Sequence, residues 1–164
     1  LNACSSESST SSSHTQNGQI EAVSAHWLET SSENADWGRA ILLFSDQSIS
    51  CESLPDHAPG LASLWRDEPI QGTGTGTLVW LQWLDLDDEI DSWEGRFVFG
   101  EAPINDRTQR RAIQIPYTRG EPQFDRTGRH GSIRILSAEA DEISGSIESD
   151  QLSGHFHAVS CSPN

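Results

Sequence analysis

Five carboxylates lie within seven consecutive residues, in the segment Asp85-Leu-Asp-Asp-Glu-Ile-Asp91. Ca²⁺ takes six to eight oxygen ligands, and carboxylates clustered on a turn can supply them. The segment has neither the glycine at the sixth position nor the glutamate at the twelfth position that an EF-hand loop requires. Two interpretations stay open, a solvated acidic turn between strands or a calcium site. The candidate calcium ligands are Asp85, Asp87, Asp88, Glu89 and Asp91.

Two histidines are the second group that could hold a metal. His155 and His157 are two residues apart in a strand-like segment, so their side chains should lie on one face, opposite Phe156 and Ala158. Paired imidazoles can chelate Zn²⁺, Cu²⁺ or Ni²⁺. A structural zinc site needs four ligands, and only His130 or an acidic residue of a neighbouring strand could add to the pair. The alternative is a pair of exposed strand histidines.

Six tryptophans could bind sugars or could fill a core. Trp80 and Trp83 have opposite parity on one strand, so they cannot form one flat sugar-binding platform. Each buried indole removes about 150–250 Å² from water, which favours the core. A carbohydrate-binding module nevertheless stays open as an alternative function.

Composition excludes several kinds of chemistry. All ten basic residues are arginine, which leaves no lysine for a phosphate loop, a Schiff base or a general base. The glycine-rich repeat Gly72–Thr77 is therefore better explained as the entry to a strand. No Gly-x-Ser-x-Gly elbow occurs. A pair of carboxylates for glycoside hydrolysis is a property of the folded chain and stays open. We expect no enzyme, with a small hydrolase as the third alternative.

The net charge of the chain limits which classes of partner it is expected to bind. The formal net charge is −15, which disfavours nucleic acid and anionic lipid headgroups and favours cations. No apolar run approaches the roughly 18–20 residues of a membrane span.

The elements that carry these residues are predicted to be β-strands. Short apolar or alternating runs are separated by turn residues, with no long helical period. The pattern predicts an all-β domain, an antiparallel β-sandwich or open barrel of about eight strands that ends in a three-stranded meander. The run Ala40–Phe44 suits a strand covered on both faces. The expected strands are 20–27, 39–45, 78–84, 93–99, 110–117, 131–136, 143–148 and 152–159.

The cysteines indicate export. Leu1-Asn-Ala-Cys4 resembles a bacterial lipobox, whose cysteine is lipidated and becomes the mature N-terminus. Residues 5–19 are polar and Ser-rich and predict a disordered tether, so that 1–19 is the lipobox remnant with its tether and 20–164 a single β-domain. In an oxidising compartment the remaining Cys51 and Cys161 should form a disulfide. The loop would span about 110 residues.

Two stretches resemble a loose group of uncharacterised Gram-negative lipoproteins. These are Arg39-Ala-Ile-Leu-Leu-Phe-Ser-Asp46 with the following Ser50-Cys51, and the ending Ile143–Cys161 with its Gly-x-Phe-x-Ala-x-x-Cys strand. The resemblance supports fold and location and implies no activity. The expected function is that of a non-catalytic, exported lipoprotein of the outer membrane or cell surface. Its β-domain would bind or support an envelope protein or polysaccharide, without a cofactor other than a possible Ca²⁺. It would touch the membrane only through its lipid anchor and would bind no nucleic acid. A metal-assisted carbohydrate-binding module is the alternative.

Overall fold

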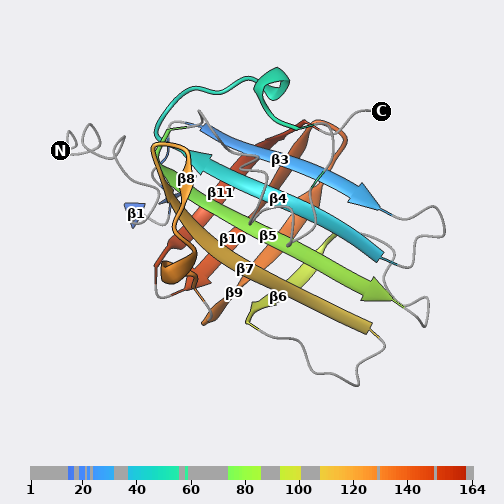
Figure 1. Ribbon diagram of the computed structural model, residues 1–164. Helices are drawn as coiled ribbons and strands as arrows, with labels where there is room; N and C mark the ends of the chain where they lie inside the picture. Colours follow the sequence, from blue (N-terminus) through green and yellow to red (C-terminus); the bar gives the residue numbers. More distant parts are fainter. Residues whose placement is uncertain are drawn as a thin grey trace.

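The computed structural model describes residues 15–16, 19–20, 22, 24–31, 37–55, 58, 74–85, 93–100, 108–128, 130–149 and 151–161, to which the structural statements below refer. Their regular elements are eleven β-strands and two short 3-10 turns, Cys51–Ser53 and Phe124–Arg126 (Figure 1). The strands are β1 (Thr15–Gln16), β2 (Gln19–Ile20), β3 (Ser24–Ser31), β4 (Trp37–Ser45), β5 (Gly76–Asp85), β6 (Gly95–Phe99), β7 (Thr108–Thr118), β8 (Glu121–Pro122), β9 (Gly131–Ala138), β10 (Glu142–Ser149) and β11 (Ser153–Ser160). A search of this part of the chain for helices long and apolar enough to cross a membrane finds none.

Eight of the strands close into a barrel. Their order is β3-β4-β5-β7-β6-β9-β10-β11, and β11 pairs again with β3. The predicted all-β class is confirmed. The barrel is closed and mixed, however, rather than open and wholly antiparallel, because β6 runs parallel to β7 and β3 runs parallel to β11. Alternating side chains look the same beside a parallel or an antiparallel neighbour, so periodicity did not reveal these two pairs.

The first expected strand, 20–27, is divided in the structure. Its beginning forms β2, which pairs with β11 at Gln19 and His155, and its end belongs to β3, which pairs with β11 farther along. β2 and β3 therefore share one edge of β11.

The inside of the barrel is the main core. Outward and inward residues alternate along each strand, and the inward ones pack together. Its members are Trp27, Ala40, Leu42, Phe44, Val79, Leu81, Trp83, Trp93, Phe97, Phe99, Ala112, Ile133, Ile135, Ile143, Ile147, Leu152, Phe156 and Ala158.

A second core covers the outside of β3, β4, β5 and β7. This is why every residue of the run Ala40–Phe44 is buried, as predicted, and why Trp80 and Trp83 enter different cores. The second core consists of Leu28, Ile41, Leu43, Leu54, Leu78, Trp80, Ile115 and Tyr117.

A carboxylate sits among the tryptophans of the main core. Glu29 accepts hydrogen bonds from Nε1 of Trp27 (3.2 Å) and Nε1 of Trp93 (2.5 Å). The two indoles meet edge to face with centroids 5.1 Å apart, and Trp93 stacks on Phe97. Burying two indole N–H groups requires an acceptor, and Glu29 supplies both oxygens.

The ends of the long connection between β4 and β5 are tied together. Asp46 donates its backbone N–H to the Thr75 carbonyl and accepts the Thr75 N–H on Oδ1, each at 2.9 Å. Next to them, Gly76 lies so close to the Phe44 carbonyl that an added Cβ would stand 1.9 Å from that oxygen. The buried Tyr117 hydroxyl donates to the same carbonyl at 2.6 Å. The entry to β5 thus requires glycine at position 76, because a side chain there would collide with the Phe44 carbonyl.

Candidate functional site

The two halves of the barrel surface differ. The outside of β3, β4, β5 and β7 lies under the second core, whereas the outward side chains of β6, β9, β10 and β11, here called the open face, are not part of either core. The three exposed large hydrophobic residues of the described chain, Val98, Leu136 and Val159, are all on these strands, with 48–54 % of their surface accessible. The open face is therefore where this barrel can meet another molecule.

Strand register places one polar row across the open face. Arg96 of β6 is opposite Arg134 of β9, Arg134 is opposite Ser146 of β10, and Ser146 is opposite His155 of β11. The next row brings together Val98, Ser132, Glu148 and Ser153. Directly opposite residues have Cβ atoms about 4.5–5.5 Å apart, so the members of a row can contact one ligand.

The rows border a hollow of about 340 Å³. Gly131 at its edge has φ +107°, and an added Cβ would stand 2.0 Å from the Glu148 carbonyl, so only glycine fits there. The lining residues are Arg96, Gly131, Ser132, Arg134, Ser146 and Glu148.

Two arginines line this hollow although the chain as a whole is strongly acidic. The net charge is −15, yet two of the ten arginines stand directly opposite each other. Within the described residues no ion pair or hydrogen bond joins either guanidinium to another side chain. Like charges in this position repel. A bound carboxylate would relieve the repulsion, because guanidinium groups hold carboxylates with two parallel hydrogen bonds.

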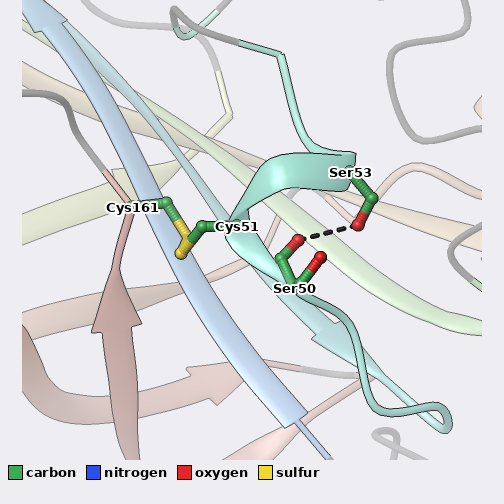
Figure 2. The surroundings of a disulfide bond; sticks show 4 residues. All are labelled: Ser50, Cys51, Ser53 and Cys161. Carbon is green, nitrogen blue, oxygen red and sulfur yellow. Dashed lines mark hydrogen bonds between the residues drawn. A yellow bond between two sulfur atoms is a disulfide. The ribbon is translucent and has the colours of Figure 1, made fainter.

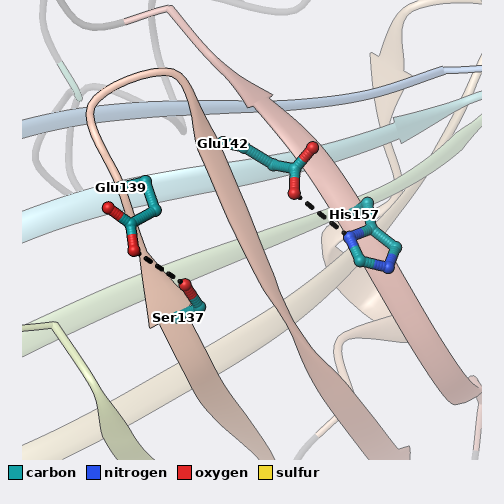
Figure 3. Close-up of polar contacts among 4 residues, drawn as sticks. All are labelled: Ser137, Glu139, Glu142 and His157. Atoms are coloured by element: carbon teal, nitrogen blue, oxygen red, sulfur yellow. Dashed lines mark hydrogen bonds and ion pairs between the residues drawn. The ribbon is translucent and has the colours of Figure 1, made fainter.

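The two histidines lie on the open face as predicted. Both are exposed, while Phe156 and Ala158 are buried on the other side. His157 Nδ1 is 3.4 Å from Glu142 Oε1, beside the turn in which the Ser137 hydroxyl donates to Glu139 (Figure 3). Neither histidine belongs to a group of three potential metal ligands within the described ranges. A metal at this pair would need ligands from outside the described residues.

The acidic segment divides at the limit of the described residues. Asp85 is the last residue of β5, has 1 % of its surface accessible and engages a partner, so it belongs to the barrel rather than to a solvated turn. The other four candidates, Asp87, Asp88, Glu89 and Asp91, lie outside the described residues. Calcium binding there stays a prediction. Cys4 and residues 5–14, 17 and 18 of the predicted tether 5–19 are also outside, whereas its residues Thr15–Gln16 and Gln19 lie in the paired strands β1 and β2.

The predicted disulfide is confirmed. Cys51 and Cys161 are bonded, with Cα atoms 5.2 Å apart (Figure 2). Cys51 begins a 3-10 turn that follows β4, in which the Ser53 hydroxyl donates to the Ser50 carbonyl at 2.7 Å. Cys161 follows β11 and donates its N–H to the Trp27 carbonyl at 2.6 Å. Because β3 lies between β11 and β4 in the sheet, the disulfide connects segments on the two sides of β3.

A histidine that the sequence did not single out stands beside this bond. A ring nitrogen of His26 and the sulfur atoms of Cys51 and Cys161 all lie within 4.8 Å of one another. His26 has only 6 % of its surface accessible, and its Nδ1 has no hydrogen-bond partner. Burial lowers the pKa of the imidazole, and a hydrogen bond with the backbone of Ile49 acts in the opposite direction. The ring is thus a buried imidazole whose protonated form is disfavoured by burial and whose Nδ1 has no hydrogen-bond partner.

Sequence reasoning missed His26, Arg96 and Arg134 for a common reason. Alternation in Arg96-Phe-Val-Phe and Ile133-Arg-Ile marks both arginines as outward-facing. Nothing in either segment says that β6 and β9 are neighbours or that the two arginines share a row. The approach of His26 to the cysteines likewise depends on the parallel β3–β11 pair.

Comparison with known proteins returns no match, whether to protein-family models, to curated proteins or to solved structures.

Proposed function

We propose that this chain is a non-catalytic, lipid-anchored envelope protein whose open face binds an acidic sugar of an envelope polysaccharide. The observation that carries the proposal is the pair of unneutralised arginines, Arg96 and Arg134, at the hollow. The carboxylate of the sugar would bridge the two guanidinium groups. The hydroxyl groups of the same sugar would form hydrogen bonds with Ser132, Ser146 and the acceptor Glu148. Neutral sugars would have no group for the arginines.

The binding can be tested with uronic acid oligosaccharides and their neutral counterparts by calorimetric titration. Arg96→Gln and Arg134→Gln should each weaken binding of the acidic oligosaccharide about 10- to 100-fold, since a hydrogen bond to a charged group contributes about 1.5–3 kcal/mol. Arg126→Gln is the matched control, because this exposed arginine of the second 3-10 turn does not line the hollow and its loss changes the net charge equally. Equal affinity for neutral and acidic sugars would contradict the proposal.

The lipid anchor rests on Leu1-Asn-Ala-Cys4 and the Ser-rich segment after it. The Cys51–Cys161 bond supports it, because disulfides persist in compartments reached by export. Expressed with a complete signal peptide in a Gram-negative host, the chain should partition into detergent, and Cys4→Ser should release it. A mature N-terminus upstream of Cys4 without lipid would contradict the anchor.

A metal-assisted carbohydrate-binding module is the second candidate, because His155 shares a row with the two arginines. In that case Zn²⁺ or Ni²⁺ should raise both the melting temperature and the sugar affinity. His155→Gln with His157→Gln should abolish both effects. Without such an effect the arginine pair alone accounts for binding.

A further inference from the structure

We propose that Cys51, Cys161 and His26 form a site for a thiophilic metal ion, Zn²⁺ or Cu⁺, which the disulfide closes and reduction opens. The site is separate from the open face and does not depend on the sugar-binding proposal. It would make the barrel a redox-gated metal-binding protein.

The ligand types suit these ions. Two thiolates and one imidazole form a soft set that selects Zn²⁺ or Cu⁺ over Ca²⁺ or Mg²⁺. Three protein ligands leave one position of a tetrahedral zinc ion for water or a small ligand, and they can complete a three-coordinate Cu⁺ site. Both cysteines are partly exposed rather than buried.

The distances suit the same ions. With Zn–S near 2.3 Å and Zn–N near 2.0 Å, tetrahedral ligand atoms stand about 3.4–3.8 Å apart. The three ligand atoms already lie within 4.8 Å of one another. Cα atoms 5.2 Å apart let two thiolates reach this separation by rotation about their Cα–Cβ bonds.

The backbone that carries the ligands does not depend on the disulfide alone. β3 and β11 pair His26 with Val159 and Trp27 with Ser160, and the Cys161 N–H bonds the Trp27 carbonyl. Cys51 is held in its 3-10 turn, where the Leu54 N–H donates to the Cys51 carbonyl at 3.1 Å. Reduction would free the sulfur atoms while these bonds keep the three residues together.

The unpartnered ring nitrogen of His26 is evidence that this residue binds a ligand. Buried polar atoms are nearly always hydrogen-bonded, so an orphaned Nδ1 in a ring that is 6 % accessible calls for an explanation. An ion held by the two sulfur atoms, which lie within 4.8 Å of a ring nitrogen of this histidine, would give the ring such a partner.

The chemistry balances with a dithiol reductant. Thiol–disulfide exchange breaks the Cys51–Cys161 bond, oxidises the dithiol to a cyclic disulfide and leaves two protein thiols. Zn²⁺ then replaces the two thiol protons, which pass to solvent, and takes the lone pair of His26. In the reverse exchange, a cyclic disulfide oxidises the two thiolates to the Cys51–Cys161 bond, is itself reduced to the dithiol, and the ion is expelled.

The test uses the full chain with Cys4→Ser, so that Cys51 and Cys161 are its only thiols. After reduction by a phosphine and removal of excess reagent without oxygen, Co²⁺ should bind at one equivalent, with thiolate-to-cobalt charge-transfer absorption, and Zn²⁺ should displace it. The disulfide form should show no such absorption. X-ray absorption of the zinc complex should show two sulfur neighbours and a nitrogen, and a coordination shell without sulfur would overturn the proposal.

Two matched variants test the imidazole. His26→Gln should weaken Co²⁺ binding at least about tenfold, because even an outer hydrogen-bonding partner of a ligand contributes 10- to 100-fold to metal affinity. His130→Gln should leave it unchanged, because this exposed histidine is not part of the His26, Cys51 and Cys161 group. An unaltered affinity in His26→Gln would overturn the site as drawn.

Folding of the reduced chain is measured in the same series. Zn²⁺ should raise the melting temperature of the reduced form and not that of the disulfide form, since only the former binds the ion. A reduced chain that is unfolded and that Zn²⁺ fails to refold would likewise overturn the proposal.

Discussion

At the residue level, Glu29 shows how an acidic side chain can be required inside an apolar barrel. Its two carboxylate oxygens accept the N–H groups of Trp27 and Trp93, whose side chains are buried. Glu29→Ala should lower the free energy of unfolding by about 3 kcal/mol, because it leaves two buried donors unsatisfied. Denaturant titration followed by tryptophan fluorescence measures the loss.

Glu29→Gln is the matched control for this prediction. The amide keeps one acceptor oxygen and turns its NH₂ group toward the other indole, so we expect a smaller loss than in Glu29→Ala. Equal stability of wild type and Glu29→Ala would show that the carboxylate does not satisfy the indoles in solution.

His26 makes stability depend on pH. Burial holds the pKa of its imidazole below the ordinary value of 6.5 in the folded chain. The unfolded chain therefore takes up a proton first as the pH falls, and stability that is fully present above 6.5 is lost as the pH falls toward and through the lowered folded pKa. Denaturation at pH values from 8 to 5 should show a steeper decline for wild type than for His26→Gln. Parallel profiles would contradict the assignment.

Asp46 has a structural role that its sequence motif did not reveal. The pattern Ser45-Asp46 after an apolar strand supported a family resemblance. In the structure it has a local structural task, since Asp46 bonds both backbone groups of Thr75 and the buried Ser45 hydroxyl accepts the Gln47 N–H. The motif thus fixes the connection between β4 and β5.

At the level of elements, the pairing of β6 with β9 sets two arginines against each other. We expect Arg134→Gln to raise the free energy of unfolding by about 0.2–1 kcal/mol, because it removes the repulsion from Arg96. The gain should shrink in high salt, which screens exposed charges. Arg126→Gln is the control, since it changes the net charge without relieving a pair.

This stabilisation would be the opposite of the effect of Arg134→Gln on sugar binding. A variant that becomes more stable while it loses the ligand would mark the arginine pair as a feature kept for binding. A less stable Arg134→Gln, with Arg126→Gln unchanged, would mean that Arg134 has a structural partner instead.

The strands themselves were largely predictable, and their neighbours were not. Alternation and turn residues located β4, β7 and β10 to within a few residues, because one or both faces of each strand are buried. The closure through β6–β7 and β3–β11 was missed, since parallel partners distant along the chain leave no local pattern. The arginine row depends on the pairing of β6 with β9, and the position of His26 depends on the pairing of β3 with β11. The sequence therefore showed His155 and His157 but neither the arginine row nor His26.

At the level of the whole molecule, the barrel has one covered half and one open half. The second core shields the outside of β3, β4, β5 and β7, and the disulfide joins that covered half to the end of β11. The side chains of the open face thus belong to neither core. Ligand contacts can change there without cost to either core.

The disulfide lies at one of the two seams of the barrel with the fewest paired residues. β3 and β11 share two registered pairs, Val159 with His26 and Ser160 with Trp27, as few as β6 and β7 share, whereas β4 and β5 share nine. The Cys51–Cys161 bond closes a separation of 110 residues across this seam. The chain-entropy model gives about 4–5 kcal/mol for a loop of that size, a large share of the 5–15 kcal/mol of a typical domain.

Cys51→Ala, Cys161→Ala and the double variant should therefore lose the same stability, about 4–5 kcal/mol, when measured in chelator so that no metal contributes. The loss should be local in origin, with faster hydrogen exchange at the Cys161 amide, which bonds the Trp27 carbonyl, than at the β4–β5 amides. If the double variant were markedly less stable than either single variant, the cysteines would act separately. Uniformly faster exchange would show that the bond stabilises the barrel as a whole rather than its seam.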